Sequence, residues 1–178
     1  MDQEQPCGNG WKLLVPGICG AAAIVLIPLL LGALDGVPAG HALALAGSAL
    51  VIEYGAGVVG IALGFSPVAT FLILASVGLG LIVVLFAIFM VLGETSGRVA
   101  RFLAKTEARM ERHPFIRKWG IIALIPGVLI LGIYFIAPVA WILRWEIRSS
   151  APLIFAGYLI GSVVTILGAL GLFRLFLS

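Results

Sequence analysis

Charged side chains are scarce in this sequence. Asp, Glu, Lys and Arg make up only 11% of its 178 residues, whereas hydrophobic residues make up 62%. Soluble domains typically carry about 25% charged residues, and a chain with so few charges cannot cover a water-exposed surface. The composition therefore excludes a soluble globular domain and predicts a single polytopic membrane domain over residues 1–178.

The sequence also lacks the short motifs of common enzymes and metal sites. It contains no H-E-x-x-H, G-x-S-x-G or Walker A pattern. His41 and His113 are far apart without a Cys or acid cluster around them, and Cys7 and Cys19 are interpreted as small apolar residues. We therefore expect no enzymatic activity, no cofactor and no metal site. Without an ATP-binding motif, any transport would run downhill or on an ion gradient.

The sequence contains several long apolar segments. Uncharged runs cover 13–34, 119–143 and 149–173. Glu53 is the only charged residue in the region 36–93, which Pro67 divides because proline disfavours helix in the residue before it. About 20 apolar residues cross a bilayer as a helix. The sequence therefore predicts five membrane-depth segments, near 12–34, 44–64, 67–93, 119–143 and 150–176.

Basic side chains gather in one polar stretch, Glu94–Lys118. It carries seven basic and three acidic residues and a net charge of +4, while the whole chain has a net charge of +3. Because basic loops stay on the cytoplasmic side, we interpret 94–118 as a basic cytoplasmic connector. Nucleic-acid binding is not expected, because no aromatic or glycine-rich recognition pattern accompanies the charge.

The same charge rule favours an unusual topology. If all five segments cross the membrane, Lys12, Arg144 and Arg148 lie on the side opposite to the connector. If 44–64 and 119–143 are instead re-entrant hairpins, ten of the eleven basic residues lie on one side. We therefore predict an all-α integral protein of the cell (plasma) membrane, with three transmembrane helices and two opposed re-entrant helical hairpins arranged as an inverted repeat. Five full transmembrane spans are the alternative.

Both predicted hairpins contain residues that interrupt helices. The run Glu-Tyr-Gly-Ala-Gly at 53–57 lies in the middle of the first, so a turn at Gly55 or Gly57 would lie near the membrane midplane. Pro126 and Gly127 are expected to break the second. Broken helices at membrane depth occur where they are packed in protein or line a cavity, and transporter substrate sites commonly form there.

Glu53 is the main candidate for chemistry. A lone ionisable side chain near the bilayer centre is costly, so it usually faces a partner or a wet cavity. We expect desolvation to favour the neutral acid, which would let Glu53 take up and release a proton. The alternative is a protonated Glu53 that caps exposed backbone at the turn. The candidate residues for substrate or proton binding are Glu53, Tyr54, Gly55, Gly57, Pro126, Gly127 and Tyr134.

The layout resembles the small multidrug export protein family of archaea and bacteria and, more distantly, the DedA superfamily. The resemblance covers about residues 44–173. It rests on Glu53 in a glycine-rich hairpin, on Gly60-Ile61-Ala62-Leu63-Gly64-Phe65-Ser66-Pro67, on the basic connector, on Pro126-Gly127 and on a glycine-rich last helix. The family often has Arg shortly after the glutamate, where this chain has Tyr54 and Gly55, so an intramembrane Glu–Arg pair is not carried over.

The resemblance implies a small membrane transporter or exporter of lipophilic or amphipathic molecules, with Glu53 as the proton-coupled group. A DedA-like flippase or scramblase for lipids or polyprenyl phosphate is one alternative, and a non-transporting membrane assembly factor is another. The implied partners are membrane lipids and a lipophilic small-molecule or lipid substrate, and association into a homo-oligomer is left open.

Overall fold

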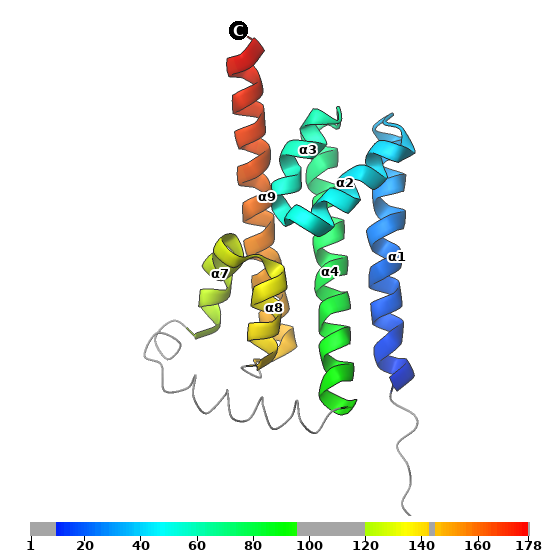
Figure 1. Cartoon of the computed structure of the whole chain (residues 1–178), viewed down its shortest axis with the longest axis vertical. Coiled ribbons are helices and arrows are strands. Elements are labelled where there is room, and N and C mark those ends of the chain that lie inside the picture. The colour runs from blue at the N-terminus through cyan, green and yellow to red at the C-terminus, as the bar shows by residue number, and fades with distance from the viewer. Residues whose placement is uncertain (1–9, 96–119, 143–144, 178) are drawn as a thin grey trace, which may run out of the picture.

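The fold is given by a computed structural model that describes residues 10–95, 120–142 and 145–177. Every regular element in these ranges is a helix, as predicted. The elements, numbered as in Figure 1, are α1 (Gly10–Leu34), α2 (Ala39–Ile52), the 3₁₀ turn η1 (Glu53–Gly55), α3 (Ala56–Ala62), α4 (Pro67–Thr95), the 3₁₀ turn η2 (Gly120–Ala123), α7 (Leu124–Leu131), α8 (Ile133–Ile142) and α9 (Ile147–Leu177). The predicted connector 94–118 lies outside the described residues except for the last two residues of α4.

Three long helices, α1, α4 and α9, form the frame of the molecule. They run along its long axis, with α4 between the other two (Figure 1). Ile73 and Leu74 of α4 are fully buried, whereas Leu30 of α1 and Leu167 of α9 are exposed. Helices that are apolar both toward the core and toward the outside are typical of membrane spans, because lipid rather than water surrounds them.

Four segments of the described chain are long and apolar enough to cross a membrane. They are Val15–Leu34, Ala39–Ala62, Pro67–Met90 and Ile147–Gly171. The prediction of an all-helical membrane protein is therefore confirmed, and three of these segments match the predicted spans 12–34, 67–93 and 150–176. The fourth, Ala39–Ala62, qualifies by length and composition but is divided at η1 into two helices.

The segment 39–62 folds back on itself, and we call α2, η1 and α3 the first hairpin. In Figure 1, α2 descends from the end of α1 to the middle of the molecule and α3 returns to the level where α2 began. Ala42, near the start of α2, and Phe65, just after α3, both lie against Gly32 of α1. A Cβ on Gly32 would stand 2.8 Å from Ala42 Cβ and 3.7 Å from the ring of Phe65. The first hairpin begins five residues earlier than predicted, since the turn that precedes it is made at Gly36, where φ is +74°.

A hydrogen-bonded clasp fixes the base of the first hairpin. The Asp35 carboxylate accepts a bond from the Ser66 backbone N–H and another from the Ser66 hydroxyl, both 2.8 Å long. Ser66 directly precedes α4, and its hydroxyl oxygen in turn accepts a bond from the Ala69 N–H. The clasp therefore caps the N-terminus of α4 and joins the residues on either side of the first hairpin.

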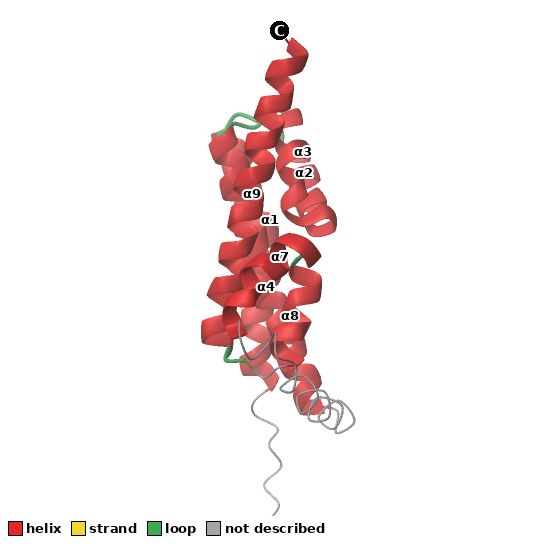
Figure 2. Cartoon of the chain, turned by 90° about the vertical axis from the view of Figure 1, so that its left-hand side faces the viewer, coloured by secondary structure: helices red, strands yellow, loops and turns green. Residues whose placement is uncertain are grey.

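The segment 120–142 also reverses, and we call η2, α7 and α8 the second hairpin. It extends from the opposite end of the molecule, so that the two turns meet near its middle (Figure 1). The two hairpins lie on the same side of the long helices (Figure 2). At the far end of α8, the ring of Trp141 stacks on Phe89 of α4 with centroids 5.4 Å apart.

The prediction that Pro126 and Gly127 break the second hairpin is wrong in position. Both residues lie inside α7, and the chain reverses at Gly132, where φ is +82°. Pro126 occupies the first turn of α7, where a backbone N–H would have no helical partner, so proline is tolerated there. Gly127 instead allows close packing of the two arms, because a Cβ there would stand 2.8 Å from Ile136 Cδ1.

The expected turn at Gly55 or Gly57 lies close to the observed one, because η1 ends at Gly55, but neither glycine has a positive φ. Gly55 has ordinary helical dihedral angles, and Gly57 lies within α3. The left-handed residue is Glu53 itself, with φ +52° and ψ −130°. A side chain in this region of dihedral space costs about 1–3 kcal/mol, which surrounding contacts must offset.

Candidate functional site between the hairpin turns

Glu53 is buried where the two turns meet, with 8% of its surface exposed. Its Oε2 accepts a hydrogen bond of 2.8 Å from the backbone N–H of Ile133, and its Oε1 accepts one of 3.3 Å from the N–H of Tyr134. These amides belong to the first turn of α8, which has no helical partner for them and carries a partial positive charge. Glu53 of the first hairpin therefore caps a helix of the second.

Gly132 makes this contact possible. A Cβ at that position would stand 2.5 Å from Oε1 and 2.6 Å from Oε2 of Glu53. The positive φ of Gly132 also excludes most side chains. A side chain at position 132 is therefore disfavoured twice, by the positive φ of the backbone and by the nearby Glu53 oxygens.

Two tyrosines join the turns in a reciprocal arrangement. The Tyr54 hydroxyl donates a 2.7 Å hydrogen bond to the Leu129 carbonyl of the second hairpin. The Tyr134 hydroxyl donates to the Leu50 carbonyl of the first. The N–H that would complete the helical bond to Leu129 is that of Ile133, which donates to Glu53 instead. Each hairpin therefore satisfies a helix-end carbonyl of the other.

Helix α9 supports the first turn from behind. The Thr165 hydroxyl lies 2.7 Å from the Tyr54 carbonyl oxygen, to which it donates. The Tyr54 ring lies over Gly161, where a Cβ would stand 2.9 Å from Cγ of the ring, and it meets Tyr158 edge to face at 6.3 Å. Gly57 approaches α9 closely as well, since a Cβ there would stand 2.7 Å from Thr165 Oγ1.

A groove of about 310 Å³ opens beside Glu53 between the two turns. Among the described residues that line it, Glu53 is the only charged one. The lining residues are Val51, Ile52, Glu53, Tyr54, Ile130, Leu131, Gly132, Tyr134 and Phe135. Val51 and Ile130 are each 79% exposed, and Phe135 is 67% exposed, so the rim of the groove is apolar and faces away from the bundle.

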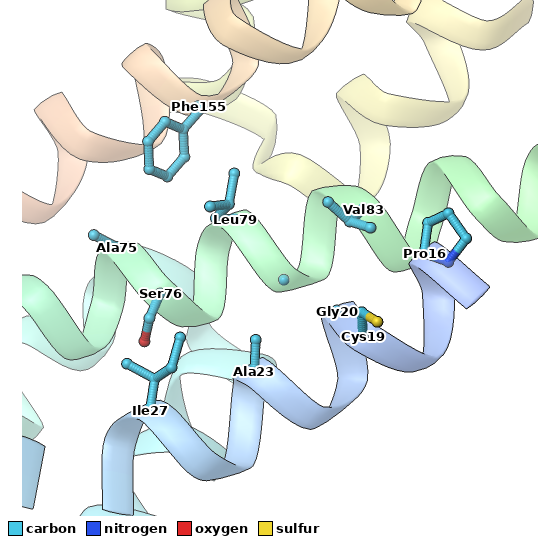
Figure 3. A pocket seen from close by; sticks show the side chains of 11 residues that line it. Pro16, Cys19, Gly20, Ala23, Ile27, Ala75, Ser76, Leu79, Val83 and Phe155 are labelled. Atoms are coloured by element: carbon cyan, nitrogen blue, oxygen red, sulfur yellow. The ribbon is translucent and has the colours of Figure 1, made fainter. Parts of the chain in front are cut away.

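A second hollow, of about 490 Å³, lies between α1 and α4 with Phe155 of α9 at its edge (Figure 3). The small residues Gly20 and Gly80 let the two helices approach closely, since a Cβ on Gly20 would stand 3.0 Å from the Gly80 carbonyl oxygen. Among the described residues that line this hollow, the polar side chains are those of Cys19 and Ser76, and none is charged. The groove beside Glu53, which has a carboxyl group, is therefore the better candidate site.

The structure brings together three of the predicted site residues. Glu53, Tyr54 and Tyr134 line the groove and bond across the two hairpins, whereas the other four lie elsewhere. Gly55 lies in η1 and Gly57 packs on α9; Pro126 and Gly127 lie in α7, away from the turn. In the described ranges, no group of three His, Cys, Asp or Glu side chains is placed to hold a metal ion.

The sequence reasoning missed Gly132 and the two amides that bind Glu53. Gly132 had a usable signal, because it lies at the centre of the apolar segment 119–143 and separates two runs of bulky residues. Backbone N–H groups have no such signal, since every residue except proline has one.

Known proteins add no further assignment. The chain matches no protein-family model, no curated protein and no solved structure.

Proposed function

We propose that the chain is a small multi-pass transporter or exporter of the plasma membrane for lipophilic or amphipathic molecules, with Glu53 as its proton-coupled group. In this proposal α1, α4 and α9 span the membrane, and the two hairpins are re-entrant and related as an inverted repeat. The proposal agrees with the resemblance to the small multidrug export protein family.

One observation carries the proposal: a buried acidic side chain joins the turns of the two hairpins beside a groove with an apolar rim. Glu53 accepts hydrogen bonds from two N–H groups of the second hairpin. Protonation removes its charge and weakens both bonds, because hydrogen bonds to a charged group are about twice as strong as neutral ones. Proton uptake would therefore loosen the contact between the turns and open the groove.

Two features support the re-entrant arrangement of the first hairpin. The Asp35–Ser66 clasp places both of its ends at one end of the long helices. Alternating access needs a contact that can be made and broken near the midplane, and the meeting of the two turns supplies one. An inverted pair of hairpins also puts Lys12, Arg144 and Arg148 on the side of the connector, as the charge rule favours.

A lipid flippase or scramblase of the DedA kind is the second candidate. The exposed apolar rim of the groove favours it, because Val51, Ile130 and Phe135 would let an acyl chain slide from the bilayer to the site. A non-transporting assembly factor would need neither a groove nor a titratable group.

Transport by proteoliposomes tests the proposal. Vesicles with the wild-type chain should accumulate or release a fluorescent amphiphile when a pH gradient is imposed, and Glu53→Gln should abolish the effect of the gradient. Asp35→Asn is the matched control, since it makes the same acid-to-amide change at the base of the same hairpin and should keep the pH response.

The other functions predict different results in the same vesicles. Movement of a labelled phospholipid between leaflets, independent of the gradient, would favour the scramblase. No movement of amphiphile or lipid would favour the assembly factor. If Glu53→Gln transports with the pH dependence of the wild type, Glu53 is only a structural cap.

A further inference from the structure

We infer that the groove between the hairpin turns binds a cationic amphiphile, with a substituted ammonium head group beside Glu53 and an apolar tail along the rim. The inference rests on the proposed function and names its substrate class. Four features of the groove support it: an acidic side chain without a basic partner among the described residues, an occupied helix N-terminus, aromatic lining residues and a small volume.

The first feature is the charge of Glu53. The carboxylate is buried, and in the described part of the chain it bonds only to neutral backbone N–H groups. A buried charge is costly unless an opposite charge or a proton balances it. The two oxygens of a carboxylate offer about four acceptor positions, and two are occupied. Glu53 therefore has both the charge and the free lone pairs to bind a cation.

The second feature argues against an anionic head group. Helix N-termini are ready-made anion sites, and the groove contains one at the start of α8. The backbone N–H groups of Ile133 and Tyr134 at this terminus already donate to Glu53. A phosphate or sulfate would have to displace this carboxyl group, and no Lys, Arg or His is among the described residues that line the groove to compensate for its charge.

The third feature is the lining around the carboxylate. Tyr54, Tyr134 and Phe135 contribute aromatic rings to it, and aromatic faces attract organic cations, above all substituted ammonium groups. Both tyrosine hydroxyls donate to backbone carbonyls. Their hydrogens are therefore directed away from a ligand, and their oxygen lone pairs remain acceptors.

The fourth feature is size. A groove of about 310 Å³ is at the lower end of ligand sites, which are commonly about 300–1,000 Å³. It can enclose a head group and the first few carbons of a tail. The remainder of an alkyl chain would lie over Val51 and Ile130 at the rim, which are exposed toward the lipid. A long tail on a small cationic head fits this shape.

Three probes with the same alkyl chain test the inference: dodecyltrimethylammonium, the neutral dodecyldimethylphosphine oxide and dodecyl sulfate. Each is titrated below its micellar concentration into the full chain in lipid nanodiscs, and saturable binding is measured by equilibrium dialysis. At pH 8 the cation should bind at least about tenfold more tightly than the other two. Saturable binding of dodecyl sulfate as tight as that of the cation would overturn the inference.

Two further measurements connect binding to Glu53. Cation affinity should fall about tenfold in Glu53→Gln and stay within about twofold of the wild type in Asp35→Asn. It should also fall between pH 8 and pH 4.5 in the wild type, which needs no folded variant. The other titratable groups that face Glu53 are the phenols of Tyr54, Tyr134 and Tyr158, which stay neutral in this range. Affinity that is unchanged by both the substitution and pH would overturn the inference.

Binding and transport separate the two proposals. Saturable, Glu53-dependent binding of the cation without movement of any amphiphile would overturn the transporter and keep the cation site. Proton-coupled transport of dodecyl sulfate that depends on Glu53 would keep the transporter and overturn the cation site.

Discussion

The two hairpins have similar shapes but are built from different residues. Each reverses at a residue with positive φ, Glu53 in the first and Gly132 in the second. Each also presents a carbonyl three residues earlier, Leu50 or Leu129, to a tyrosine of the other hairpin. The turn residues, however, are opposite in character, since one has an acidic side chain and the other has none.

This difference is complementary. The Glu53 carboxylate fits against Gly132 because that position lacks a Cβ. Two glutamates at the turns would repel each other, and two glycines would leave the α8 amides without an acceptor. The two turns can therefore share a backbone geometry, but this contact forms only when one turn carries a glutamate and the other a glycine.

The largest effect should come from removing that asymmetry with Gly132→Ala. The new methyl group meets both the positive φ and the Glu53 oxygens, so we expect a loss of about 3 kcal/mol or more in the free energy of unfolding. The matched control is Gly64→Ala, because Gly64 also has positive φ (+89°) but nothing within 4 Å of its Cβ position. It should cost about 1–2 kcal/mol. Denaturant titration in detergent measures both, and equal losses would mean that the carboxylate contact adds nothing.

A smaller effect is expected for Glu53→Gln, which keeps the shape of the turn. The amide offers one acceptor oxygen and places an NH₂ group against a backbone donor, so one α8 amide loses its partner at a cost of about 1–3 kcal/mol. Asp35→Asn changes a carboxylate that also accepts two bonds but is only half-buried. Water can replace its lost bond, and the cost should be smaller. A larger loss from Asp35→Asn would show that the clasp, and not the meeting of the turns, holds the first hairpin in place.

The two tyrosines should differ by less. Tyr54→Phe removes the hydroxyl that donates to the Leu129 carbonyl, and the Tyr54 ring is packed on Gly161. Tyr134 is less well packed, since it lies beside the groove with 37% of its surface exposed. We expect a loss of about 1 kcal/mol for Tyr54→Phe and about half of that for Tyr134→Phe. Thermal unfolding of the two variants side by side measures the order, and the reverse order would contradict the view that the first turn is the better packed of the two.

The smallest effect on stability is expected from cysteines placed at the hairpin ends, which report topology. In a chain from which Cys7 and Cys19 have been removed, Ala39→Cys and Ala62→Cys should react with a membrane-impermeant reagent from the same side. Ser149→Cys should react from the other side, because the base of α9 lies at the opposite end of the molecule (Figure 1). Labelling of positions 39 and 62 from opposite sides would mean that the segment between them crosses the membrane.

Much of the fold could be predicted from local signals. Uncharged runs of more than 20 residues located the long helices, and the Glu-Tyr-Gly-Ala-Gly run at 53–57 located the first turn to within a few residues. The glycine signal was misleading, because five glycines in 44–64 suggested that the turn would use one of them. Two of them, Gly57 and Gly60, instead allow close packing, and a Cβ at Gly60 would collide with the Thr70 side chain.

The partners of Glu53 could not be predicted, for two physical reasons. A search of the sequence for a countercharge finds only side chains, and the groups that bind Glu53 are backbone amides of α8. Those amides are free because α8 begins at Ile133, and that start depends on Gly132 rather than on the more conspicuous Pro126-Gly127 pair. The sequence therefore predicts an isolated acid, whereas the structure gives Glu53 two hydrogen-bonding partners.

The reciprocal bonds between the turns also set an order of events during synthesis. Glu53 and Ile133 are 80 residues apart in the chain, so the first hairpin is synthesised long before its partner. Until then the Glu53 carboxyl group and the Leu50 carbonyl lack the partners that the second hairpin supplies. Contacts between distant segments form slowly, because the intervening chain must be closed into a loop. The first hairpin is therefore an unfinished element during biogenesis, and the arrival of the second hairpin completes both.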